Sequence, residues 1–189
     1  RLKASNVTER SIKLTWSKVK GADSYVIFGS LCGRSYKRIK TVDKKAARTY
    51  TVKKTVYGKL AKGRYYKFAV AAVKNIKGSE KQIALSKSVH AVTKGGKYSN
   101  FKGIKLKNVK NKTISLNMKK EKTFSIKAAA VKAANTKTRI HRRLCYESSD
   151  KSVAKVNSKG LVTAIGKGKC FIYVYLQDGT GKKITVSVK

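Results

Sequence analysis

Few side chains in this sequence have the type and spacing that catalysis or metal binding requires. His90 and His141 are isolated, with no HExxH spacing and no carboxylate cluster beside them in the sequence. Glu147 and Asp150 are close together, but they fall in a Ser-Ser-Asp turn, where such side chains normally bond their own backbone. The acidic residues, too scattered for a paired-carboxylate glycosidase site, are Glu9, Asp23, Asp43, Glu80, Glu121, Glu147, Asp150 and Asp178. We therefore predict no catalytic residue, no metal ligand and no cofactor.

The three cysteines are Cys32, Cys145 and Cys170, so at least one is unpaired and no disulfide framework is indicated. There is no CxxC motif to support metal or redox chemistry. A pair of His141 with Cys145 would be a nucleophile only with a positioned base and an oxyanion site. Cys170 stands in a β-pattern where a small apolar residue belongs, which predicts buried packing.

Net charge is the unusual feature of the composition. The 189 residues contain 47 Lys and Arg against 8 Asp and Glu, a formal charge of +39 at pH 7. The excess is spread over both halves of the chain, whereas a nucleic-acid reader usually concentrates its charge on one face. The sequence thus favours a surface that lives beside a polyanion such as a wall polymer, anionic lipid headgroups or an acidic glycan, or else a solvated, self-repelling surface with no partner.

The elements that would carry these side chains are short strands. Residues 11–17 alternate, with Ile12, Leu14 and Trp16 on one face, which is typical of a half-buried strand. No segment has a helical period, and no run of 18 or more apolar residues predicts a membrane span. Further strands are predicted at residues 25–28, 36–42, 66–72, 85–92, 103–107, 113–118, 123–131, 140–146, 154–156, 161–164, 170–175 and 182–188.

Short strands at this spacing predict an all-β fold of two tandem immunoglobulin-like β-sandwiches. The length fits two domains of about 100 residues. Paired glycines in Lys94-Gly95-Gly96-Lys97 indicate a joint with some freedom. We predict a first domain at 1–94, a linker at 95–101 and a second domain at 102–189. The first residue, Arg1, is not a Met, and we expect the chain to be a stretch of a longer protein.

The first domain resembles a fibronectin type III domain. Three features carry the resemblance: Trp16 at the end of the alternating strand, the run from Gly21 to Ile27, and the run from Leu60 to Val70. The resemblance implies that Leu60 and Tyr66 form a tyrosine corner, in which the tyrosine hydroxyl bonds nearby backbone. Lys62 stands where that family usually has proline, so a looser turn is expected.

The second domain resembles the bacterial immunoglobulin-like domain of group 2. The match runs from Tyr146 to Gly168, and Tyr146 occupies a position where the family more often has tryptophan in its core. Residues 157–160 supply a turn in which Gly160 can take a positive φ. Gly166-Lys167-Gly168 lacks the full phosphate-loop motif and a following helix, so a tight turn is expected there as well.

Two groups of residues are candidates for binding. The family pattern turns Cys170, Ile172 and Val174 to the core, so the side chains between and after them share the other face. These form an aromatic strip of Phe171, Tyr173 and Tyr175, either covered by neighbouring side chains or serving as a ligand or domain-docking surface. The second group is a weak basic cluster of Arg139, Arg142 and Arg143, which is hard to distinguish from the basic surface in general.

The two resemblances together imply a non-catalytic spacer or adhesion module of a secreted or cell-surface bacterial protein of Gram-positive type. Its expected partners are anionic cell-wall polymers, acidic glycans or other surface proteins. An alternative is that the two domains target a larger wall-active or carbohydrate-active enzyme to its substrate. Nucleic-acid binding driven by charge is a third, less favoured hypothesis, and it predicts steep salt dependence.

Overall fold

The computed structural model describes residues 1–189, and they form two compact all-β units. The first unit contains residues 1–100 and 133–141, and the second contains residues 101–132 and 142–189. Sequence reasoning placed residues 133–141 within the second domain, whereas in the structure they pack with the first unit. The predicted all-β class is confirmed, and the only helical segment is the short 3₁₀ turn η1 (Lys110–Lys112). No helix has the length and apolar character needed to cross a membrane.

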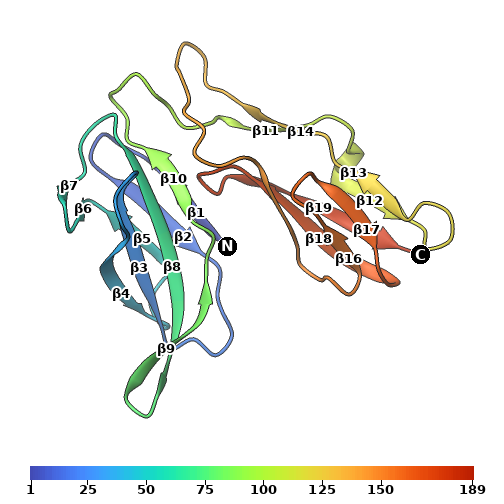
Figure 1. The fold of residues 1–189 in the computed structure, drawn as a ribbon, viewed down its shortest axis with the longest axis horizontal. Helices are drawn as coiled ribbons and strands as arrows, with labels where there is room; N and C mark the ends of the chain where they lie inside the picture. Colours follow the sequence, from blue (N-terminus) through green and yellow to red (C-terminus); the bar gives the residue numbers. More distant parts are fainter. The chain divides into compact units, whose positions relative to one another are not determined.

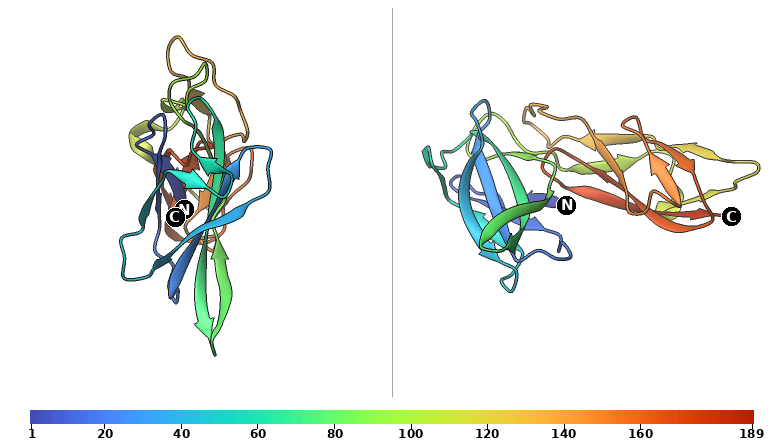
Figure 2. Two further views of the ribbon diagram at one scale, coloured as in Figure 1. Left: turned by 90° about the vertical axis from the view of Figure 1, so that its left-hand side faces the viewer. Right: turned by 60° about the horizontal axis from the view of Figure 1, so that its bottom comes forward.

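The first unit is a sandwich of two antiparallel sheets (Figure 1). One sheet has the order β1-β2-β5 and the other β10-β8-β3-β4, with β9 paired to the C-terminal part of β8. The β8–β9 hairpin projects beyond the other strands of this unit (Figure 2). The strands are β1 (Leu2–Ser5), β2 (Ile12–Trp16), β3 (Ser24–Leu31), β4 (Lys37–Asp43), β5 (Thr49–Val52), β6 (Lys54–Thr55), β7 (Gly58–Lys59), β8 (Tyr65–Ile76), β9 (Ser79–Leu85) and β10 (Val89–Val92).

The core of the first unit follows the period-two pattern. Ile12, Leu14 and Trp16 on β2 are all buried and share one hydrophobic cluster with Leu60 and Phe68. The Trp16 ring packs at a tilt on Tyr25, with 5.7 Å between centroids. Tilted aromatic pairs at this distance contribute beyond the area that they bury, so Trp16 helps to hold β2 against β3.

The implied tyrosine corner is present in the first unit. The Ala61 amide donates a hydrogen bond of 2.9 Å to the Tyr66 hydroxyl, while the Leu60 side chain is fully buried next to it. The turn between them holds Gly63 at a φ of +66°, a conformation that costs glycine little. Lys62 in place of proline therefore does not prevent the corner from forming.

The glycines at residues 95–96 pack tightly onto the first unit. A Cβ added to Gly96 would lie 2.5 Å from the Gly63 Cα, closer than a real side chain allows. The Gly63 amide also donates to the Lys94 carbonyl at 2.9 Å. The paired glycines, which we expected to give a joint with some freedom, permit close approach of two backbone segments within one unit.

The second unit is also a sandwich, with sheets ordered β12-β19-β18-β15 and β13-β17-β16 and a separate pair β11-β14. The pairing of β12 with β19 is parallel, and the other pairings are antiparallel. The strands are β11 (Gly103–Leu106), β12 (Thr113–Leu116), β13 (Thr123–Ser125), β14 (Ala128–Val131), β15 (Cys145–Ser148), β16 (Ala154–Val156), β17 (Leu161–Ala164), β18 (Gly168–Tyr175) and β19 (Gly181–Val188).

Side chains of β18 form the centre of the second core. Cys170, Ile172 and Val174 are buried together, as the family pattern implies, and Cys170 is a free thiol in that core. Tyr146 is half-buried and packs against the same cluster. Gly160 closes its turn at a φ of +86°, with its would-be Cβ 2.9 Å from the Tyr146 ring. The positive φ predicted there is confirmed.

Three predicted strands differ from the observed ones because their backbone bonds go elsewhere. Residues 123–131 divide into β13 and β14 at Ile126, whose amide donates to the Gly160 carbonyl while the flanking strands join different sheets. Residues 85–92 divide at Ser86, whose amide donates to Val70. Within residues 140–146 only Cys145 and Tyr146 are in a strand. The preceding loop belongs to the first unit, where the Arg139 amide donates to the Tyr65 hydroxyl.

Candidate functional site

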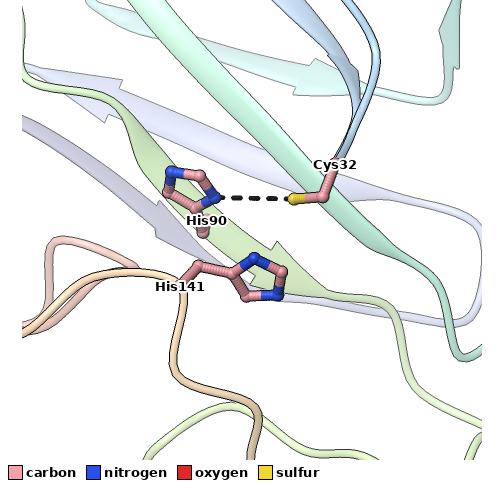
Figure 3. A group of neighbouring side chains, drawn as sticks. All are labelled: Cys32, His90 and His141. Atoms are coloured by element: carbon pink, nitrogen blue, oxygen red, sulfur yellow. Dashed lines mark hydrogen bonds between the residues drawn. The ribbon is translucent and has the colours of Figure 1, made fainter.

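Three side chains far apart in the sequence meet at the end of the first sandwich. Cys32 directly follows β3, His90 lies on β10, and His141 comes from the loop of residues 133–141 (Figure 3). The first two are held on either side of β8: the Cys32 amide donates to the Tyr65 carbonyl at 2.9 Å, and His90 is in register with Lys67. His90 and His141, which are isolated in the sequence, are thus neighbours in the structure.

The three side chains bring their ligand atoms together. The Cys32 thiol lies 3.5 Å from His90 Nδ1, and one ligand atom from each of Cys32, His90 and His141 falls within 4.8 Å of the others. The two imidazole rings are stacked, with 5.3 Å between centroids and 15° between planes. A cysteine with two histidines is a donor set that zinc and copper use in proteins.

Contacts with Tyr65 position the loop that carries His141. The Arg139 amide donates to the Tyr65 hydroxyl at 3.1 Å, and the His141 ring packs on the Tyr65 ring at 4.5 Å between centroids. The Arg139 guanidinium lies over the Tyr98 ring, 5.2 Å from its centroid. Tyr65 therefore connects β8 to the loop and sets the position of the His141 imidazole.

On the other side of the cluster, Ser88 contacts the His90 ring. Its hydroxyl lies 3.2 Å from His90 Nε2, while the Cys32 thiol lies at Nδ1. Either tautomer of the imidazole satisfies both contacts, because the serine hydroxyl and the thiol can each donate or accept. In both tautomers Nδ1 faces the Cys32 thiol.

Burial shifts the pKa values of two of these groups. It raises the pKa of the Cys32 thiol to about 11, against a smaller opposite effect of Lys67. Burial, and then the charge of Arg139, lowers the pKa of His141. Both groups are accordingly neutral near pH 7. An activated nucleophilic cysteine has a lowered pKa, so the Cys32 thiol is not prepared for nucleophilic attack.

A basic cavity of about 600 Å³ opens beside the cluster. Cys32 and His141 line it together with two tyrosines and three cationic side chains. No carboxylate is among its lining residues, which are Leu31, Cys32, Gly33, Gly63, Arg64, Tyr65, Lys97, Tyr98, Arg139 and His141. Guanidinium and ammonium groups around aromatic rings suit an anionic ligand.

The aromatic strip is uneven in exposure. Phe171 is 37% exposed, Tyr173 is half-buried and Tyr175 is only 8% exposed. The Phe171 and Tyr173 rings lie 6.5 Å apart, and the Lys183 ammonium sits 4.3 Å from the Phe171 centroid. Burial and hydrogen bonding to Glu147 raise the pKa of Tyr175. Its ligand role stays a prediction, which Phe171 and Tyr173 carry better than Tyr175.

The predicted basic cluster divides between the two units. Arg139 belongs to the first unit and lines the cavity, whereas Arg142 and Arg143 belong to the second. The Arg142 guanidinium donates to the Leu176 carbonyl at 3.3 Å and lies 5.9 Å from the Tyr175 ring centroid. Arg143 is exposed.

Sequence reasoning missed Cys32 and His90 as site residues because 58 positions separate them. No local spacing motif connects such residues. The available signal was topological. Cys32 directly follows β3 and His90 lies on β10, and both of these strands pair with β8. The position of His141 had no such signal, because it depends on a loop from a distant segment.

Comparison with known families identifies the second sandwich. Residues 104–187 match the bacterial Ig-like domain (group 2). Group 2 bacterial Ig-like domains occur in bacterial surface proteins and are generally non-catalytic modules. The resemblance of the second domain to this family is thereby confirmed. No curated protein matches the sequence.

Three solved structures illustrate what the chain is similar to. The fibronectin type III domain of human contactin 1 is 19% identical, covering 52% of this chain and 80% of that one, with a TM-score of 0.40. A C-terminal fragment of intimin, solved with the intimin-binding domain of its translocated receptor, is 12% identical, with coverages of 99% and 62% and a TM-score of 0.33. Domains 1–6 of the surface layer protein SbsC are 17% identical, with coverages of 99% and 25% and a TM-score of 0.30.

Proposed function

We propose that this chain is a non-catalytic spacer and adhesion module of a secreted or cell-surface bacterial protein, and that it associates with anionic wall polymers or acidic glycans. The observation that carries the proposal is the charge of +39 on two sandwiches, the second of which belongs to a family of surface modules. Such a charge raises the local concentration of a polyanion near the whole surface.

The basic cavity supports a defined contact with the polymer in addition to this general attraction. Arg64, Lys97 and Arg139 line it together, and Tyr65 and Tyr98 add aromatic surface to its wall. Arginine forks bind carboxylate and phosphate groups in two-point fashion, and aromatic rings pack on sugar faces. A phosphate-bearing or carboxylate-bearing sugar unit is the ligand chemistry that this cavity favours.

The aromatic strip supports a second contact. Phe171 and Tyr173 lie next to one another near the Lys183 ammonium on β18 and β19. Rigid rings provide contact area at a low cost in conformational entropy, and a nearby cation suits an acidic glycan. We propose that the strip adds to glycan binding without being required for the fold.

Binding of the purified chain to wall teichoic acid, acidic glycans and duplex DNA, at low and physiological salt, tests the proposal. Saturable binding to a wall polymer or glycan that persists at physiological salt is expected. Absence of binding to these polymers even at low salt would contradict it. Tighter binding to duplex DNA than to any wall polymer at physiological salt would favour the nucleic-acid hypothesis instead.

Matched variants separate a defined site from general charge. The triple variant R64Q/K97Q/R139Q removes three charges from the cavity. The control K53Q/K54Q/K59Q removes three charges from exposed positions around the β6–β7 hairpin of the same unit. We expect the cavity variant to weaken binding about tenfold more than the control, the effect of one lost charge-assisted contact of about 1.4 kcal/mol. Equal losses of binding in the two variants would show that the cavity is not a defined site and that the chain binds through its general charge.

The strip is tested in the same assay with the double variant F171S/Y173S. Both side chains are at least partly exposed, so binding should weaken while the far-ultraviolet circular dichroism stays that of the parent. Unchanged glycan binding would remove the strip from the proposal. The alternative role, targeting a larger enzyme to its substrate, stays a prediction that the sequence of the parent protein decides.

A further inference from the structure

We propose that Cys32, His90 and His141 form a binding site for one thiophilic d¹⁰ metal ion, with Cu⁺ preferred over Zn²⁺. The inference is independent of glycan binding, since it rests on the three side chains alone. Their ligand atoms all lie within 4.8 Å of one another in the structure that contains no ion.

The distance between the Cys32 sulfur and the His90 nitrogen is close to the one that two ligands of a single metal ion have. Metal–sulfur bonds of about 2.3 Å and metal–nitrogen bonds of about 2.05 Å at tetrahedral angles place sulfur and nitrogen about 3.5 Å apart. Cys32 Sγ and His90 Nδ1 are already at 3.5 Å. The ligand atom of His141, which the loop of residues 133–141 carries, lies within 4.8 Å of the other two.

The outer contacts prepare the histidines as ligands. Ser88 bonds His90 Nε2 and leaves Nδ1 facing the thiol, the role that outer-shell partners have in natural metal sites. The Tyr65 ring packs on His141 and fixes its loop.

Charge decides between the two ions. A bound thiolate with two neutral imidazoles makes a Cu⁺ centre neutral and a Zn²⁺ centre singly positive. The adjoining cavity already holds Arg64, Lys97 and Arg139, so a further positive charge is unfavourable there. Soft thiolate ligands also favour Cu⁺. Binding releases the Cys32 proton to solvent, so low pH opposes binding.

Competition with a Cu⁺ chelator under anaerobic, reducing conditions, and with a Zn²⁺ chelator in parallel, tests the proposal on the full chain. The background is C145S, which removes the half-buried free thiol of the other unit. One Cu⁺ per chain is expected, bound more tightly than Zn²⁺. Zn²⁺ binding tighter than Cu⁺ would overturn the preference, and no binding of either ion would overturn the site.

Variants identify the ligands. C32S should weaken Cu⁺ binding more than S88A, and S88A should weaken it about tenfold, the usual effect of losing an outer-shell partner. The control S35A removes a hydroxyl from the exposed loop after Cys32 and should leave affinity unchanged. Equal affinity of C32S and its parent would overturn the assignment.

A measurement on the unsubstituted chain, which keeps Cys145, covers the case in which C32S fails to fold. Cu⁺ should slow alkylation of Cys32 and leave alkylation of Cys145 unchanged, as read by mass spectrometry of peptides. Both thiols are partly accessible, so both give a signal. Equal alkylation of Cys32 with and without Cu⁺ would overturn the proposal.

Discussion

At the scale of single residues, two tyrosine hydroxyls accept backbone hydrogen bonds that hold turns of the first sandwich in place. The Tyr66 hydroxyl accepts from the Ala61 amide, and the Tyr25 hydroxyl accepts from the Val19 amide at 3.0 Å. In both cases the ring lies in the core while the hydroxyl reaches a backbone group at its edge. Each bond thus connects a loop to a buried anchor.

Y66F should destabilise the first unit by about 1 kcal/mol, the net value of a typical hydrogen bond, because the ring stays packed while the Ala61 amide loses its partner. Urea unfolding measures the change. The control Y57F alters an exposed tyrosine whose hydroxyl lies 3.4 Å from that of Ser35, and it should change stability by less than about 0.5 kcal/mol. Equal effects of the two variants would show that the corner bond adds nothing.

At the scale of elements, close approach of two turns fixes how the first sandwich ends. Gly96 and Gly63 touch through their backbones, and Lys94 bonds both Gly63 and Thr8 through its main chain. The chain leaving β10 is in this way fastened to the turn before β8 and to the loop after β1. This fastening positions Lys97 and Tyr98 along the cavity.

G96A should destabilise the first unit by about 1–3 kcal/mol, since its Cβ would lie 2.5 Å from the Gly63 Cα and one backbone segment must shift. The control is G103A, where nothing lies within 4 Å of the added Cβ and φ is not in the positive region. That variant should be neutral or slightly stabilising, because alanine restricts the unfolded chain. Urea unfolding measures the free energy of unfolding of both variants. No loss of stability in G96A would mean that the turns at Gly63 and Gly96 can move apart at no cost.

Local patterns predicted the strands whose alternation reflects a single buried face. Ile12 to Trp16 and Cys170 to Val174 were placed correctly because period two needs no knowledge of the partner strand. The division of residues 123–131 was not predictable, since Ile126 bonds a distant turn. The Cys32 and His90 cluster was beyond sequence reasoning for the same reason: strand pairing across β8 creates it.

At the scale of the whole molecule, self-repulsion is the main consequence of the composition. Arg38 pairs with Glu80 at 3.0 Å and Lys44 with Asp23 at 2.7 Å, but 47 basic side chains face only 8 acidic ones. A net charge so far from zero destabilises a compact chain. The repulsion is long-ranged at low ionic strength, where the Debye length is about 30 Å at 0.01 M, and it is reduced at 0.15 M, where that length is about 8 Å.

We therefore expect the urea midpoint of unfolding to rise between 0.01 M and 0.15 M sodium chloride. For a denaturant slope of about 2 kcal/mol per molar urea, each kcal/mol of relieved repulsion shifts the midpoint by about 0.5 M. Potassium fluoride at the same ionic strength should give the same shift if screening is the cause. A midpoint that falls with salt would mean that attractive pairs such as Arg38 with Glu80 outweigh the repulsion, because screening weakens both. A rise would mean that the folded chain carries an electrostatic cost that a bound polyanion relieves, so wall polymer added at low salt should raise the midpoint in the same direction.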